Sequence, residues 1–509
     1  MGGLALLVVA LSFFLSSPKD SREPPELRPA IPIIGHMIGM FRYTVFYYAT
    51  LRGSSNVPIF TIVLPGSKMY IISSPPLITA IQKLTKAVSF ATMAAKASGR
   101  VAGCSDAALE IINNNVDLSK GPESDSFVHS FFKAIVPPLR PGSSLDAMNR
   151  IMIENISGST NALAKRTPTR INLAKWLRRE ITLATTNAVY GPENPYADEE
   201  NEQAFWTYEQ HIMLFMIGIL PSITARKGLQ ARAKLADAFV QYFTKEAQAK
   251  ASALAQMRYS CGREWGFSVE DIARFEPGNA IALLSNTFPT AYWMLYYIFS
   301  NPKVLEDCRQ EIESATKINQ GNGTATHTID VSAIKASCPI LASTLQEVLR
   351  YRSVGMSVRE VLEDTLLDGQ YLLKKGGTVV IPSNVLHTDP AHWGADVDDF
   401  NHRRFLTKTS NPVAFRAFGG GNTLCPGRHF ASTEVMALVC MFIARFEMEP
   451  VGGWPSPVVT DVKIWAQIIE PHMDLEVDIR ARDLGAGKHV WEFGLTDSEL
   501  QFALAAEDK

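Results

Sequence analysis

The feature that most constrains the fold of this chain is a glycine-rich segment that leads into a single cysteine and then into an apolar stretch. Residues 418–431 read FGGGNTLCPGRHFA, and a mostly apolar run expected to be helical extends from Cys425 to Phe446. A cysteine at the start of a helix lies at the positive end of the helix dipole, which favours the thiolate. Glycines allow the backbone to approach a flat macrocycle closely and to adopt positive φ angles. The segment therefore predicts a thiolate ligand for the metal of a planar cofactor.

The spacing F-x-x-G-x-x-x-C-x-G is formed by four residues, Phe418, Gly421, Cys425 and Gly427. A lone cysteine beside a helix cap has a simpler interpretation as a buried thiol, but this spacing resembles the haem-binding signature of the cytochrome P-450 family. The resemblance implies haem b as cofactor, Cys425 as the axial ligand of its iron, and Phe418 as a shield of the sulfur from water. The chain departs from the family at Thr423, where an arginine or histidine often contacts a haem propionate.

Three further motifs have the order expected for the same family. Glu347 and Arg350 resemble its E-x-x-R motif, and their spacing places acid and base on one face of a helix. Arg404 lies in FNHRRF, which resembles the F-x-P-x-R-F segment of the family, and would complete a structural network with both residues beneath the haem. Arg359 would pair with a propionate, because its planar fork suits a carboxylate. The alternatives are a solvated surface pair for the helix motif and an ordinary surface arginine for Arg359.

The long apolar stretch at residues 278–299 is too hydrophobic on all sides for a surface helix, so a central buried helix is expected. Pro289 cannot donate a hydrogen bond to the carbonyl of Ser285, and the helix should be kinked there. The N-T-x-P pattern at this position resembles the branch of the family that contains sterol 7α-hydroxylases, sterol 12α-hydroxylase and prostacyclin synthase. The resemblance places the kink directly above the iron.

Three residues at the kink are the candidate catalytic residues, Ser285, Asn286 and Thr287. Ser285 replaces the acid, and Asn286 the first threonine, that the family usually has in this helix. Asn286 can both donate and accept, so it could hold dioxygen or a water; alternatively, it caps the carbonyls that the kink frees. Either water with Asn286 and Thr287 supplies protons, or the reaction needs no proton relay.

The resemblance implies a monooxygenase that uses O2 and electrons from NADPH-cytochrome P-450 reductase. The expected substrate is a hydrophobic small molecule, a terpenoid or steroid-like intermediate of secondary metabolism of the fungal style. A basic face for docking of the reductase would be supplied by Arg352, Arg403, Arg416 and Arg428. Two alternatives stay open, a reductase-independent isomerase or dehydratase on the same scaffold and a non-catalytic haem-binding sensor.

The N-terminus predicts attachment to a membrane. Gly2 to Leu15 are uncharged and mostly apolar, and Lys19 and Arg22 follow them. This order favours a single-pass signal anchor at residues 1–18 over a cleavable signal peptide, with the catalytic body on the cytosolic side. By the same resemblance, the membrane would be that of the endoplasmic reticulum.

The rest of the chain is expected to form a proline-rich hinge at residues 19–32 and a single haem-binding catalytic domain at residues 33–509. The expected fold class is mainly α with small β-sheets (α+β), the cytochrome P-450 fold, with the haem between the central helix and the helix of the cysteine ligand. Local patterns predict strands at residues 59–64 and 69–72, a loop-rich segment at 88–116, and two long helices within 203–257.

Composition limits the classes of partner that the protein is expected to bind. The formal net charge is -2, which gives no sign of a nucleic acid partner. The six cysteines are scattered and show neither a zinc-site spacing nor a disulfide framework. We expect a monomer whose partners are the substrate, the reductase and the membrane.

Overall fold

Helices form most of the computed structural model, which describes residues 20–31, 34–55, 57–321, 323–407, 411–457, 462–463, 465–472 and 475–496. The expected fold class, mainly α with small β-sheets, is confirmed. The helices are α2 (Gly35–Tyr43), α3 (Phe46–Ser55), α4 (Pro75–Lys83), α5 (Ala91–Ala102), α6 (Asp106–Asn113), α7 (Phe127–Ile135), α8 (Ser143–Ala164), α9 (Leu173–Tyr190), α10 (Glu199–Gln210), α11 (Ile212–Ile217), α12 (Pro221–Thr224), α13 (Arg226–Thr244), α14 (Ala253–Glu264), α15 (Val269–Leu284), α16 (Thr287–Phe299), α17 (Pro302–Ala315), α18 (Val331–Ser337), α19 (Pro339–Arg352), α20 (Ser383–His387), α21 (Pro390–Trp393) and α22 (Arg428–Arg445).

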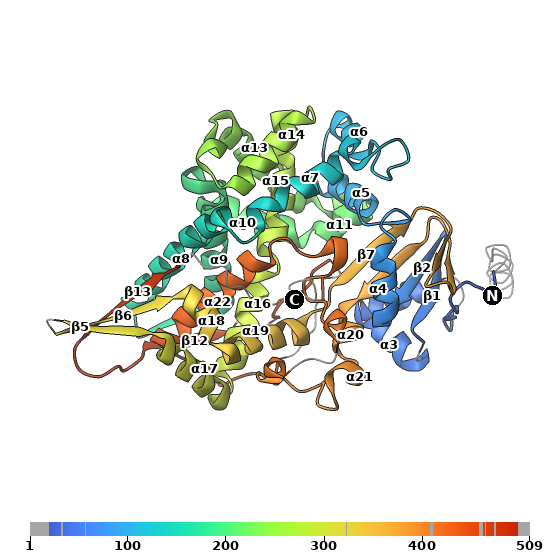
Figure 1. The fold of residues 1–509 in the computed structure, drawn as a ribbon. Coiled ribbons are helices and arrows are strands. Elements are labelled where there is room, and N and C mark those ends of the chain that lie inside the picture. The colour runs from blue at the N-terminus through green and yellow to red at the C-terminus, as the bar shows by residue number, and fades with distance from the viewer. Residues whose placement is uncertain are drawn as a thin grey trace.

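The largest sheet has the strand order β1-β2-β10-β7-β3, and in Figure 1 it lies at one end of the molecule beside α3 and α4. Its strands are β1 (Ile59–Leu64), β2 (Ser67–Ile72), β3 (Val88–Ser89), β7 (Met356–Val361) and β10 (Thr378–Pro382). The other strands are β4 (Thr169–Asn172), β5 (Lys317–Gly321), β6 (Thr324–Asp330), β8 (Thr365–Leu367), β9 (Tyr371–Leu373), β11 (Phe446–Pro450), β12 (Glu476–Ala481) and β13 (Lys488–Gly494). The strands predicted at residues 59–64 and 69–72 are confirmed as β1 and β2.

The central helix is split where Pro289 predicts a kink. It begins earlier than expected, at Val269, and α15 ends at Leu284 before α16 starts at Thr287. All thirteen residues of α16 are buried, and α16 and α22 lie together at the centre of the molecule (Figure 1). The all-round hydrophobicity of the stretch therefore reflects burial on every face from Thr287 onward.

Two predictions about local structure are wrong. The segment at residues 88–116 is largely helical, because α5 is rich in alanine and small residues that favour helix without forming a stripe of large apolar side chains. The segment at residues 203–257 contains one long helix, α13, and several short ones. Gly218, with φ 70°, ends α11, and Ser252 caps the start of α14, so local stop and start signals divide the segment.

Glu434 is a buried acid in the middle of α22. Its side chain is 0% exposed, and its Oε1 accepts a hydrogen bond of 2.6 Å from Thr185 Oγ1 on α9. The second oxygen has no hydrogen-bond partner within the described part of the chain. Burial raises the pKa of Glu434 to about 8. The folded protein therefore keeps this carboxyl protonated under neutral conditions.

The pKa of Glu434 predicts a pH-dependent contribution to stability. The folded state holds the proton up to about pH 8, whereas an unfolded chain releases it near its ordinary value of 4.5, so raising the pH between these values lowers the free energy of unfolding. Glu434→Gln keeps the acceptor for Thr185 and cannot ionise. We expect urea unfolding to show the variant about 2 kcal/mol more stable than wild type at pH 8, with a smaller difference at about pH 5. A difference that is constant with pH would contradict the assignment.

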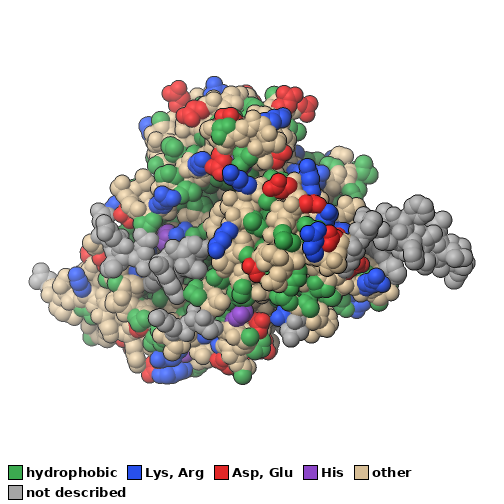
Figure 2. Space-filling model, turned by 45° about the vertical axis from the view of Figure 1, so that its right-hand side comes forward, with side chains coloured by type: hydrophobic (Ala, Val, Ile, Leu, Met, Phe, Trp, Pro, Cys, Tyr) green, Lys and Arg blue, Asp and Glu red, His purple; other side chains and the backbone are tan. Residues whose placement is uncertain are grey.

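Among the described residues, no helix has both the length and the apolar character needed to cross a bilayer. The expected anchor at residues 1–18 lies outside the described residues. Lys and Arg side chains are interspersed with Asp, Glu and hydrophobic side chains on the face shown in Figure 2.

Candidate active site

The loop before α22 forms a tight turn that presents Cys425. The backbone N–H of Cys425 donates to the carbonyl of Phe418 at 2.9 Å, which closes the loop. Gly419 has φ 78°, and a Cβ there would lie 2.7 Å from the Thr423 carbonyl oxygen. Gly421 has φ 59°. These two glycines are required by the backbone of the loop itself, whatever the loop binds.

The helix expected from Cys425 begins only at Arg428, so the sulfur precedes its first turn. Burial raises the pKa of the Cys425 thiol, while the N–H groups of Gly427 and Arg428 and the positive charge of Arg428 act in the opposite direction. Burial, the larger of these effects, opposes the stabilisation of the thiolate that the position before the helix predicts. A Cβ on Gly427 would meet no atom within 4 Å, so protein packing does not require glycine there. Glycine at this position fits a flat group that lies close to the backbone.

Arg359 lies beside this loop. It belongs to β7, opposite Val379 of β10, and is 1% exposed. Its Nη2 donates to Thr423 Oγ1 at 2.7 Å, and its Nη1 has no hydrogen-bond partner within the described residues. Burial, together with the nearby charge of Arg416, lowers the pKa of Arg359 to about 10. The alternative of an ordinary surface arginine is excluded by this burial.

Arg416 was missed as a site residue by sequence reasoning. It is 3% exposed, and a Cβ on Gly420 would lie 2.2 Å from its Nη1, so the guanidinium is packed against the glycine turn. Two buried guanidinium groups, Arg359 and Arg416, therefore lie near each other beside the Cys425 loop. The buried Nη1 of Arg359, which has no partner within the described residues, suits an anion such as a carboxylate.

The predicted basic docking face is wrong for two of its four members. Arg352 and Arg416 are buried, at 5% and 3% exposure, and cannot present charge to a docking protein. Arg403 is half exposed and forms an ion pair of 2.7 Å with Asp307. Arg428 donates to the carbonyl of Cys425 at 3.1 Å. Arg403 and Arg428 thus also make contacts within the protein, which a count of basic residues along the sequence does not reveal.

The structure brings Glu347, Arg350 and Arg404 together. Arg350 donates to both carboxylate oxygens of Glu347, at 2.7 and 2.8 Å, and Arg404 Nε lies 3.1 and 3.2 Å from the same oxygens. Glu347 is 0% and Arg350 1% exposed, so the alternative of a solvated surface pair does not apply. Arg404 also donates to the carbonyl of Trp393, the last residue of α21, and so links α21 to α19.

His387 connects this network to the cysteine loop. Its Nδ1 lies 3.0 Å from the Arg350 carbonyl, and its Nε2 accepts from the backbone N–H of Arg416 at 2.8 Å. Burial lowers the pKa of His387 to about 3, so the ring stays neutral and donates through Nδ1. His387 thus links the backbone of Arg416 to the end of α19 through one hydrogen bond to each.

The three candidate catalytic residues lie at the split in the central helix. Ser285 Oγ is buried without a hydrogen-bond partner in the part of the chain described. Thr287 Oγ1 donates to the Leu283 carbonyl at 3.0 Å, so its proton is committed to the helix backbone. Ser285 therefore carries the one hydroxyl of the three residues that is not bonded to the described protein.

Asn286 makes a contact that neither earlier interpretation considered. Its Oδ1 accepts from the backbone N–H groups of Gln467 and Ile468, at 3.0 and 3.3 Å. The acceptor is therefore used by a segment about 180 residues further along the chain, and only the Nδ2 donors remain for a ligand. No local pattern could have revealed this bond, because it depends on tertiary structure.

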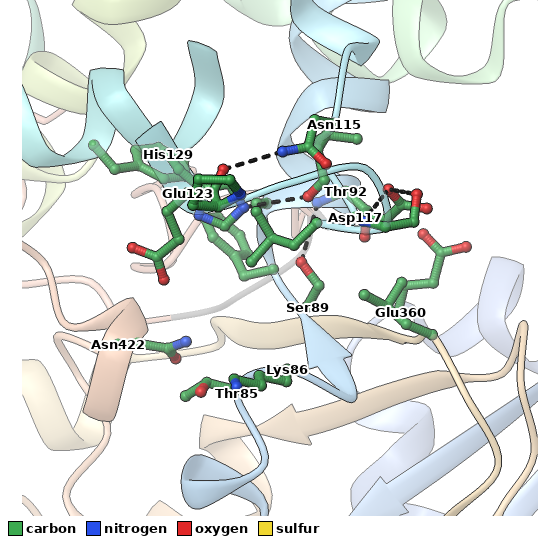
Figure 3. Close-up of a pocket in the computed structure, with 18 of the residues that line it drawn as sticks. Thr85, Lys86, Ser89, Thr92, Asn115, Asp117, Glu123, His129, Glu360 and Asn422 are labelled. Carbon is green, nitrogen blue, oxygen red and sulfur yellow. Dashed lines mark hydrogen bonds between the residues drawn. The ribbon is translucent and has the colours of Figure 1, made fainter. Parts of the chain in front are cut away.

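A cavity of about 1350 Å³ is lined in part by Asn422 of the cysteine loop. It is lined by residues 85–96, the loop at 113–123, α7, the end of β7 and Asn422. In Figure 3, Asn422 lies across this cavity from Asn115. Glu360 lines the cavity while Arg359, its neighbour on β7, does not, which agrees with the alternation of side chains along a strand. The guanidinium of Arg359 therefore points to the opposite face, toward Thr423.

The site thus combines a cysteine in a glycine turn, two buried arginines beside that turn and a split helix at the centre of the fold. The chain belongs to the cytochrome P-450 family, whose model matches residues 24–464. It is 36% identical to a cytochrome P-450 monooxygenase, nodJ, of Hypoxylon pulicicidum, over 98% of this chain and 99% of that protein. It is 29% identical to a cytochrome P-450 monooxygenase of Gibberella zeae, over 87% and 85% of the two chains. It is 24% identical to the 25-hydroxycholesterol 7-alpha-hydroxylase of Rattus norvegicus, over 68% and 87%.

The family and enzyme class expected from the sequence, including the likeness to sterol 7α-hydroxylases, are therefore confirmed. Membership implies a haem-thiolate cofactor, a redox partner and a small-molecule substrate. The residues present fit that cofactor, because the Arg359 guanidinium is buried without an acid partner in the described residues and Gly427 leaves its backbone open.

Proposed function

We propose that the protein is a haem b-dependent monooxygenase that oxidises a hydrophobic terpenoid or steroid-like intermediate of secondary metabolism. The observation that carries this proposal is the placement of Cys425 in a glycine turn beside the buried Arg359. Haem bound through a thiolate supplies the activation of O2. The likeness to a 25-hydroxycholesterol 7-alpha-hydroxylase supports a steroid-like substrate.

The residues of the chain would divide the work as follows. Cys425 would ligate the iron, and Arg359 with Arg416 would bind the propionates. Phe418, Gly421 and Gly427 would shape the loop around the sulfur. The Glu347–Arg350–Arg404 network has a structural role and would hold α19 and the segment before the loop in register.

At the split helix, Ser285 would hold and pass a proton through its free hydroxyl. Asn286 would donate through Nδ2 to dioxygen or a water, since its oxygen is already occupied. Thr287 would fix the end of the split through its bond to Leu283 rather than deliver a proton.

Electrons would come from NADPH-cytochrome P-450 reductase. The protein would be a monomer with a single catalytic domain at residues 33–509. The anchor at residues 1–18 and the hinge at 19–32 would hold this domain at the endoplasmic reticulum membrane. An exposed apolar stripe that begins at the N-cap of α2 and continues along the helix supports contact with lipid. Its members repeat at helical spacing, and Phe41 is 90% exposed; the others are Ile34, Met37 and Ile38.

A second candidate is a reductase-independent isomerase or dehydratase. The observation that favours it is the bond from Thr287 to Leu283, which commits the threonine hydroxyl to the helix backbone; no acid stands among Ser285, Asn286 and Thr287 to act with it. The test is a reduced carbon-monoxide difference spectrum of the purified protein, followed by turnover of terpenoids and steroids. Turnover that needs NADPH and reductase supports the monooxygenase, and turnover of a hydroperoxide without NADPH supports the second candidate. A protein without a thiolate-type Soret band would overturn both.

Arg359→Ala is expected to weaken haem binding by about 10- to 100-fold, because a charge-assisted contact to a propionate is lost. The measurement is the rate at which haem transfers from the purified protein to apomyoglobin. Arg480→Ala, which removes a largely exposed arginine, is the control and should leave this rate unchanged. Equal rates for the two variants would argue against a propionate contact at Arg359.

A further inference from the structure

The segment that carries Gln467 is fixed against the split in the central helix. Asn286 Oδ1 accepts from the N–H groups of Gln467 and Ile468, at 3.0 and 3.3 Å. On its other side, the Gln467 carbonyl accepts from the N–H of Val354 at 2.8 Å, and Ile468 forms an antiparallel bridge with Ser353. The backbone of Gln467 is therefore held from two directions, which fixes the direction in which its side chain leaves the chain.

Gly355 makes room for the side chain of Gln467. A Cβ on Gly355 would lie 1.7 Å from Gln467 Oε1 and 3.2 Å from its Cα. Any larger residue at this position would displace the carboxamide. The glycine at position 355 thus leaves the space that the side chain of Gln467 occupies.

Several polar groups at or near the split have no hydrogen-bond partner among the described residues. Ser285 Oγ is buried and unpartnered, and neither Asn286 Nδ2 nor the Gln467 carboxamide forms a hydrogen bond within the described residues. Ala282, in the last turn of α15 before the split, is exposed, so the structure is open at this end of α15. The nearby Ile468 is buried and apolar. Polar groups in such surroundings are stabilised by a ligand that hydrogen-bonds to them.

We propose that Gln467 determines substrate specificity by hydrogen-bonding an oxygen that the hydrophobic substrate already carries. The inference rests on the proposed function, because it takes the split helix as the substrate side of the haem. A carboxamide both donates and accepts, so it can bind a hydroxyl or a carbonyl group. The preceding reaction must then be one that leaves an oxygen on the hydrocarbon skeleton, such as a hydroxylation or a hydration.

The test measures binding to the haem-loaded full chain through the shift of its Soret band. The probes are two matched pairs, progesterone with pregnane and sclareol with labdane. Wild type is expected to bind the oxygenated member of at least one pair about tenfold more tightly than the hydrocarbon. Gln467→Leu, and Gly355→Ala by displacing the carboxamide, should reduce that preference to about twofold or less. Gln370→Leu makes the same chemical change at an exposed glutamine and should behave as wild type.

Failure of this inference is distinguishable from failure of the proposed function. The reduced carbon-monoxide spectrum of each variant shows whether the haem-thiolate site is intact. With that band present, the inference is overturned if wild type shows no preference for, or no binding of, either oxygenated probe. It is also overturned if Gln467→Leu keeps the preference. Loss of the band in wild type overturns the proposed function itself, and the inference with it.

Discussion

Replacement of Cys425 by serine is expected to abolish the thiolate-type Soret band of the reduced carbon-monoxide complex completely. A serine hydroxyl does not ionise near neutral pH and is a poor ligand for iron, so the loop would lose its donor atom. The turn itself should survive, because it is closed by the backbone bond from residue 425 to Phe418 and by the positive φ angles of the glycines. Turnover with O2 should fall to the background rate.

Cys440→Ser is the matched control. Cys440 lies in the middle of α22 at 1% exposure, and burial raises the pKa of its thiol well above the ordinary value. Such a thiol stays protonated and faces the packed interior, so its replacement should leave the band unchanged at a small cost in stability. If both variants lost the band equally, the loss would reflect misfolding and the ligand would not be assigned to Cys425.

The second large effect is expected for Glu347→Gln. Glu347 is fully buried and neutralises Arg350, which is 1% exposed, while also binding Arg404. Removing its charge leaves a guanidinium buried without compensation, which typically costs about 3–5 kcal/mol. That is a large share of the total stability of about 5–15 kcal/mol of a typical domain. We expect a low yield of folded protein, a lower urea midpoint and haem loss at lower urea concentration.

The exposed pair of Lys303 and Glu306 provides the control for this prediction. The side chains are 65% and 56% exposed and lie 3.2 Å apart on α17. Glu306→Gln should change the free energy of unfolding by less than about 1 kcal/mol, because solvent screens the pair. A similar small effect for Glu347→Gln would show that its network does not stabilise the fold.

Sequence patterns predicted those structural features that are determined by residues close together in the chain. The break at Ser285 and Asn286 follows from Pro289, whose missing N–H and bulky ring act within one helical turn. Local stiffness of β-branched and apolar residues likewise placed β1 and β2. The predictions for residues 88–116 and 203–257 failed for a local reason as well. Helices rich in alanine and short helices with local caps lack a strong apolar periodicity, which was the signal used.

The burial of Arg416 and Arg352 could not be predicted from local patterns, because the sequence around an arginine does not indicate whether its side chain is exposed or buried. The partners of Asn286 were also hidden, because Gln467 and Ile468 reach it only through the path of the chain in space. The spacing around Cys425 by itself determined the kind of chemistry, since a thiolate and glycines at fixed intervals suit only a narrow set of cofactors. Only the tertiary structure decided which polar atoms remain available to a ligand. Hydrogen bonds between distant segments occupy some donors and acceptors and leave others free, and the sequence alone does not distinguish the two.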